Sequence, residues 1–139
     1  MTSIFELSRI CAERNPDPSD QRDRIRELLE SGADVHAADR NGVTALHHAV
    51  RFRSPAAVST LIEYGADVNR ACRKSGSTPL HRAVTATGAP GTAGRRVEAV
   101  EIVRLLIRAG ADPTIRNKLD KVPLDYAKDP EIRQLLGAG

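Results

Sequence analysis

Apolar side chains recur at helical spacing in several parts of the chain, with polar residues between them. Residues 3–14 predict a helix whose apolar face is made of Ile4, Leu7, Ile10 and Cys11. Residues 20–31 predict a second helix with a narrow apolar stripe of Ile25, Leu28 and Leu29. The most apolar stretch runs from Val97 to Ile107, and we expect it to be a helix at the centre of the core.

Small polar residues and glycines mark where the predicted helices begin and end. Ser19 or Asp20 follows a turn-forming stretch and is expected to cap the second helix by accepting a backbone N–H bond. Ser54 is expected to do the same for a helix that follows it. Three glycines lie where helices should end, because a residue without a Cβ adopts the left-handed conformation that closes the last turn: Gly32, Gly65 and Gly110.

A unit of about 33 residues recurs along the chain. Its first marker is the tripeptide Gly-Ala-Asp, at residues 32–34, 65–67 and 110–112. Its second marker is a Thr-x-Leu-His stretch that begins at Thr44 and again, 34 residues later, at Thr78. A degenerate copy begins at Val122, with Asp125 in the histidine position. Such a period is typical of a stack in which each unit buries its apolar face only against its neighbours.

The repeat divides the chain into four units of one domain. An N-terminal cap covers residues 1–39, two fuller units cover 40–72 and 73–116, and a C-terminal cap covers 117–139. The third unit is longer than the second because of an insertion at residues 85–96. Glycines and a proline with few apolar anchors predict that this insertion is a mobile loop.

These motifs resemble those of the ankyrin-repeat family, over roughly residues 3–136. The two fuller copies, Asn41–Val68 and Ser75–Asp112, carry the resemblance. It implies an all-α solenoid in which each unit is two antiparallel helices, with short β-hairpin-like turns between units. It also implies that His47 and His81 are structural, each bonding to the preceding threonine, Thr44 or Thr78. A partner would lie in a concave groove made by the hairpin tips and the inner helices.

The same resemblance assigns candidate residues to that groove. Ten positions are expected to contact a partner: Arg40, Asn41, His48, Arg51, Phe52, Arg73, Lys74, Arg82, Lys118 and Tyr126. Among them, we expect Arg82, Phe52, Tyr126 and Arg73 to carry most of the binding energy, because arginine and aromatic side chains dominate such contacts.

Composition narrows the class of protein without naming a partner. The 139 residues are 40% apolar and 28% charged, and no apolar run reaches the length of a membrane span. The N-terminal residues lack the apolar core of a secretory signal, so we expect a cytoplasmic protein. Abundant alanine, arginine and glycine suit a high-GC bacterium. Cys11 and Cys72 lie in different units, and we expect neither a disulfide nor a metal site.

Charge is distributed unevenly along the chain. Residues 1–39 carry a net charge of −4, residues 40–121 carry +8 and residues 122–139 carry −1. The central repeats are therefore basic, and a basic groove favours an acidic protein partner. The simpler interpretation is that these charges only keep the array in solution.

Other functions remain as alternatives. The chain is either an interaction module that uses the groove or an accessory or inhibitory subunit of one enzyme that uses the 85–96 loop. Nucleic acid is less favoured, because aromatic residues are only 3% of the chain. Catalytic and cofactor-binding motifs are lacking, so we expect no enzymatic activity and no cofactor. A capped array is expected to be a monomer.

Overall fold

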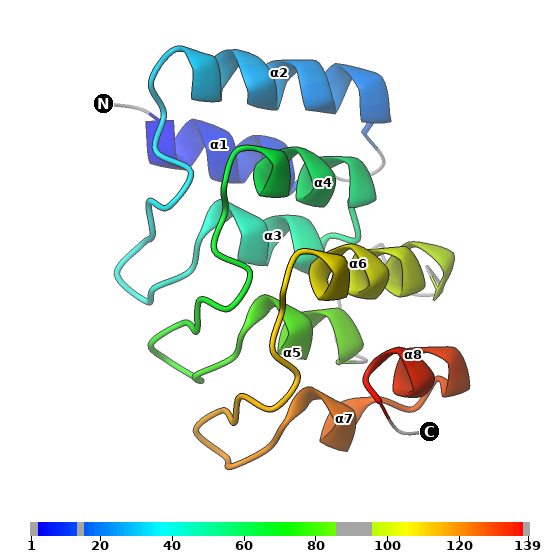
Figure 1. Ribbon diagram of the computed structural model, residues 1–139. Coiled ribbons are helices and arrows are strands. Elements are labelled where there is room, and N and C mark those ends of the chain that lie inside the picture. The colour runs from blue at the N-terminus through cyan, green and yellow to red at the C-terminus, as the bar shows by residue number, and fades with distance from the viewer. Residues whose placement is uncertain (1–2, 14–15, 86–95, 138–139) are drawn as a thin grey trace.

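The protein forms two layers of helices stacked unit upon unit (Figure 1). The computed structural model describes residues 3–13, 16–85 and 96–137. An inner layer contains α1 (Ser3–Cys11), α3 (Ala45–Arg51), α5 (Pro79–Val84) and α7 (Pro123–Tyr126). An outer layer contains α2 (Pro18–Glu30), α4 (Pro55–Glu63), α6 (Arg96–Arg108) and α8 (Pro130–Leu135). Each helix contacts its partner in the other layer or the next helix in its own. The all-α prediction is confirmed for the described residues, where the only β feature is an isolated bridge between Ala38 and Thr44.

The starts of two outer helices differ from the prediction. Helix α2 begins at Pro18, two residues early, and its cap is Asp17 rather than Ser19 or Asp20. Asp17 is in extended conformation, and its carboxylate accepts the backbone N–H of Ser19 at 3.0 Å. Ser54 stands at the cap position of α4, but its side chain makes no capping hydrogen bond. The backbone conformation of a polar residue therefore decides whether its side chain caps a helix. The residue type alone does not show that conformation.

The first helix is shorter than predicted, ending at Cys11 rather than near residue 14. The backbone N–H of Glu13 donates to the Ile10 carbonyl, three residues back, which tightens the chain after the helix. The side chain of Glu13 then pairs with Arg24 of α2 at 2.6 Å, joining the two helices of the first unit.

The core lies between the two layers. Its largest fully buried apolar side chains come from both layers and from every unit except the last: Leu7, Ile25, Leu46, Leu61, Leu80, Ile102 and Leu106. Helix α6 contributes to this core as predicted, but Val97 does not, since 71% of it is exposed. Helix α6 has 13 residues and its neighbour α4 has only 9. The first turn of α6 therefore extends past α4, and Val97 lies in that turn.

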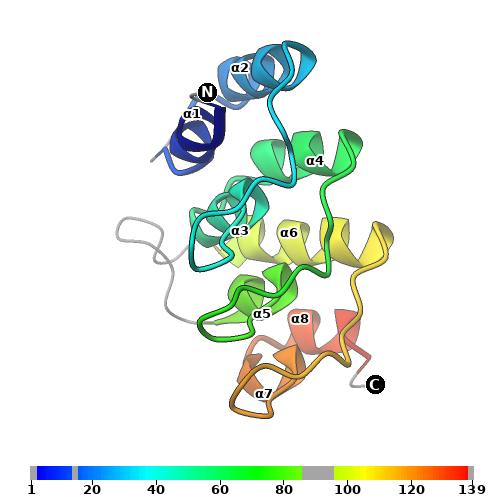
Figure 2. The same cartoon turned by 90° about the vertical axis from the view of Figure 1, so that its left-hand side faces the viewer.

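Three hairpin loops, which we call fingers, project from the inner layer and stack on one another (Figure 2). They comprise residues 39–43, 72–77 and 117–121. The backbone N–H of Arg73 donates to the Asn41 carbonyl at 2.7 Å, and that of Lys118 donates to the Ser75 carbonyl at 2.9 Å. These bonds link each finger to the next along the stack.

Glycines allow the fingers to approach this closely. Gly42 and Gly76 have positive φ, and a Cβ at either position would lie 2.9 Å from the backbone nitrogen of the next finger, at Arg73 or Lys118. The corresponding residue of the third finger is Asp120, which also has a positive φ of 61°. No further finger follows Asp120 among the described residues, so its side chain meets no such obstacle.

Two further points concern membrane-spanning helices and the 85–96 insertion. Within the described ranges, no helix combines the length and apolar character needed to cross a bilayer. Of the 85–96 insertion, only Thr85 and Arg96 are described, so the predicted loop lies outside the described residues.

Candidate partner-binding surface

The fingers and inner helices lie along one side of the molecule, which we call the inner surface (Figure 2). All ten residues predicted to bind a partner belong to these elements or to their caps. Six are exposed: Arg40, Asn41, Arg51, Arg73, Lys74 and Lys118. Four are half-buried: His48, Phe52, Arg82 and Tyr126. The structure therefore brings them to one side of the molecule, where a partner has access to them.

A threonine and a histidine hold helices α3 and α5 each to the finger of the following unit. The Nδ1 atom of His47 accepts the Thr44 backbone N–H at 3.1 Å and lies 2.9 Å from its hydroxyl. The Nε2 atom of His47 lies 3.3 Å from the Ser77 carbonyl, to which it donates. Because Nδ1 is needed as an acceptor, the neutral ring is the form that fits. Burial, with a smaller effect from Arg82, lowers the pKa of His47 to about 4.

The second copy repeats this arrangement, and the third modifies it. His81 contacts Thr78 at the same distances, and its Nε2 atom donates to the Lys121 carbonyl at 2.8 Å. Asp125 replaces the histidine in the last unit, and its carboxylate accepts the Val122 N–H at 2.9 Å. A carboxylate can cap its own helix in this way but has no proton to donate to a further finger.

The rings of His47 and His81 are thus engaged in hydrogen bonds within the fold. Over the described parts of the chain, no three His, Cys, Asp or Glu side chains are grouped so as to hold a metal ion.

Cations dominate the inner surface. Arg51 from α3 lies with its guanidinium 5.9 Å from the centre of the Phe52 ring, and Arg82 projects from α5. Burial, and then the charge of Arg82, lowers the pKa of His48.

Most ion pairs among the described residues lie in the outer layer. The described residues form seven ion pairs, and six of them join the outer helices or the turns that lead into them. The seventh, Arg116 with Asp120, lies in and beside the third finger. None of the seven includes Arg51, Arg73 or Arg82. These guanidinium groups therefore keep their capacity to pair with a carboxylate from another molecule.

Tyr126 is less available than its exposure implies. Its hydroxyl accepts a hydrogen bond from the Asn117 side chain at 2.9 Å, and its ring packs edge-on against His81 with centroids 6.3 Å apart. It supports the third finger, and only its remaining face is open to a partner.

Cys72 is a buried residue of the second finger to which the sequence analysis gave no role. It takes the position that Asp39 and Asn117 hold in the other fingers, where a side-chain oxygen accepts two backbone N–H groups. The Cys72 Sγ atom lies 3.1 Å from the Ser75 hydroxyl. Burial opposes ionisation of this thiol, but hydrogen bonds from Ser75, from finger N–H groups and from Arg82 outweigh it and lower its pKa to about 7. Aligning the three fingers in the sequence would have shown this substitution.

Arg53 is the second residue that the sequence analysis missed. It is only 7% exposed and has a positive φ of 56° at the end of α3. Its guanidinium donates to the carbonyls of Val50 at 2.9 Å, Arg82 at 3.3 Å and Thr85 at 3.0 Å. It therefore closes the C-terminal ends of α3 and α5 together, and burial lowers its pKa.

Comparison with known proteins gives a consistent match. A family model for ankyrin repeats, in three copies, matches residues 10–117. Ankyrin repeat and SOCS box protein 11 of Danio rerio is 37% identical over 112 residues, which cover 81% of this chain and 34% of that protein. Protein PhlB of Serratia liquefaciens is 38% identical over 109 residues, which cover 78% of this chain and 43% of that protein.

A solved structure is also similar. The ankyrin repeat domain of Bcl-3, described as a unique member of the IkappaB protein family, superposes with a TM-score of 0.68 at 33% identity. The match covers 85% of this chain and 47% of that one. This chain therefore spans less than half the length of each of these three similar proteins.

Proposed function

Because the chain belongs to the ankyrin-repeat family, whose repeats are protein-interaction modules, we propose that it binds the acidic surface of a partner protein in a basic concave groove. The groove would consist of the inner surface, with Arg51, Arg73 and Arg82 as its principal cations. The fold is generally a non-enzymatic one, and the proposed activity is binding alone.

The observation that carries this proposal is the absence of ion pairs at these three arginines within the described structure. A partner carboxylate would form new charge-assisted hydrogen bonds there without breaking an ion pair. The net charge of +8 over residues 40–121 supports the proposal, because a positive field speeds the approach of an acidic partner.

Affinity capture of the tagged protein from a lysate of its source organism, with and without nuclease, would identify the partner. The affinity of that partner would then be measured for Arg82→Glu and for a matched control, Arg108→Glu. Arg108 is exposed at the end of the outer helix α6 and forms none of the ion pairs among the described residues. Both variants change the net charge by the same amount.

We expect Arg82→Glu to weaken binding by about tenfold or more and Arg108→Glu to change it by less than about twofold. Equal effects of the two variants would mean that only net charge matters and would refute the groove. Loss of binding on deletion of residues 86–95, with Arg82→Glu harmless, would instead support the accessory-subunit alternative. Capture that disappears with nuclease would point to nucleic acid.

A further inference from the structure

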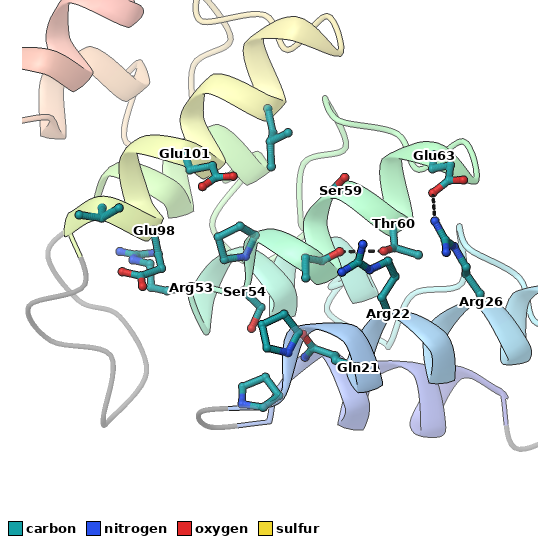
Figure 3. Close-up of a pocket in the computed structure, with 16 residues that line it drawn as sticks. Gln21, Arg22, Arg26, Arg53, Ser54, Ser59, Thr60, Glu63, Glu98 and Glu101 are labelled. Carbon is teal, nitrogen blue, oxygen red and sulfur yellow. Dashed lines mark hydrogen bonds and ion pairs between the residues drawn. The ribbon is translucent and has the colours of Figure 1, made fainter.

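The outer layer contains a hollow of about 780 Å³ on the side of the molecule away from the fingers. Figure 3 shows Arg22 and Arg26 of α2 on one wall and Glu98 and Glu101 of α6 on the other, with α4 between them. The floor includes Ala56 of α4.

The hollow follows from the lengths and side chains of the three helices. Helices α2 and α6 have 13 residues each, whereas α4 has 9. The part of α4 that lines the hollow also carries small side chains, among them Ala56 and Ser59. The hollow therefore has long walls formed by α2 and α6, and a shorter floor formed by α4.

A buried hydroxyl without a partner lies in this hollow. Ser54 is only 5% exposed, and its Oγ atom is the one buried side-chain polar atom within the described residues that forms no hydrogen bond. Leaving a buried hydroxyl unpaired costs free energy that a bound hydrogen-bonding group would recover. Ser54 is among the residues that line the hollow.

Of the charges on the two walls, Arg26 is paired, whereas Arg22 and Glu101 are not paired within the described residues. Arg26 of α2 pairs with Glu63 of α4 at 3.0 Å, across 37 residues of sequence. Arg22 lies one turn before Arg26 on α2. The residue 37 positions after Arg22 is Ser59, which has no carboxylate to pair with it. Arg22 and Glu101 take part in none of the ion pairs formed within the described residues.

We infer that this hollow is a second docking site, independent of the inner surface, for a polypeptide segment that carries one acidic and one basic side chain. The acidic side chain would pair with Arg22 and the basic one with Glu101 and Glu98. The backbone of the segment would supply a hydrogen-bonding group for the Ser54 hydroxyl. A simple anion or cation satisfies only one wall and faces like charge on the other, so the opposed charges favour a ligand that carries both.

The test uses the whole protein and a random peptide library displayed on phage. The library is selected on the wild-type protein and depleted on Ser59→Glu, which places a carboxylate at the 37-residue separation from Arg22 and narrows the hollow. Ser59 is exposed, so this variant is compatible with the fold. Selected peptides are then synthesised and their affinities measured.

We expect the selected peptides to share an acidic and a basic residue at a fixed spacing. Their affinity should fall about tenfold or more with Ser59→Glu or Arg22→Glu. It should be unchanged with Arg82→Glu, which alters only the inner surface. A peptide with its two charges exchanged should recover affinity for the double variant Arg22→Glu, Glu101→Arg.

Three results would overturn the inference. The first is failure to enrich any peptide on the wild-type protein. The second is enrichment of peptides that bind Ser59→Glu as tightly as wild type. The third is binding of free lysine or free glutamate in the hollow, seen by chemical-shift changes, without enrichment of any peptide, which would assign the hollow to a small zwitterion.

Discussion

Acid should weaken this fold through its buried imidazoles, above all that of His47. The side chain has no exposed surface, and its Nδ1 atom accepts the backbone N–H of Thr44. A proton on Nδ1 would remove that acceptor and place a positive charge in the core, within the influence of Arg82. The folded protein therefore binds this proton more weakly than the unfolded chain does.

The size of the effect follows from the pKa of His47, which falls from 6.5 to about 4 on folding. A pKa shift of one unit corresponds to about 1.4 kcal/mol, so the free energy of unfolding should fall by about 3 kcal/mol when His47 is protonated. The sign is fixed because the unfolded state binds more protons between these two pKa values. The loss begins as the pH falls through about 6.5 and is complete near the folded value of about 4.

The assay is urea unfolding from about pH 8 down to about pH 4, on wild type, His47→Gln and His36→Gln. His36 is exposed, so its variant serves as the matched control. Wild type and His36→Gln should lose about 3 kcal/mol more than His47→Gln over this range. If His47→Gln is too unstable to measure, the NMR titration of the wild-type His47 ring should show a midpoint near 4. An equal pH dependence of all three proteins, or a midpoint near 6.5, would refute the reasoning.

Three further predictions concern the thiols, the finger contacts and the buried guanidinium. Thiolate absorbance should titrate with a midpoint near 7, and Cys72→Ser should abolish that step, because burial raises the pKa of Cys11 to about 12. In urea unfolding, Gly42→Ala should cost at least about 1 kcal/mol more than Gly32→Ala, because both have positive φ but only the first meets another backbone. Equal costs would contradict the proposed contact between fingers. Arg53→Met should lower the free energy of unfolding by about 3 kcal/mol, because three carbonyls lose a charged donor, the guanidinium; a change below about 1 kcal/mol would contradict this role.

Much of the fold was predictable because the same short-range interactions recur at a fixed period along the chain. The marker stretches at Thr44 and Thr78 predict both the helices and the stacking of units. Features that depend on distant contacts were harder to predict. Arg53 reaches carbonyls 29 and 32 residues away, and the exposure of Val97 depends on the length of a different helix.

The candidate site was predictable in part for the same reason. The resemblance places the ten predicted residues on the fingers and inner helices, but which of them bind a partner stays a prediction. Tyr126 and Cys72 show the limit of residue type as a guide. A hydrogen bond inside the fold engages the Tyr126 hydroxyl, and hydrogen bonds from the finger backbone help to lower the pKa of Cys72.

The aspartate at the tip of the third finger has a consequence for anyone who wishes to lengthen the protein. A new repeat added after this finger would bring its backbone against the side chain of Asp120, as Arg73 lies against the Cβ position of Gly42. The new finger would be held away, and it would lose a hydrogen bond of the kind that joins Arg73 to Asn41. Asp120 thus acts as a stop for growth of the stack, and an extended design should first replace it with glycine.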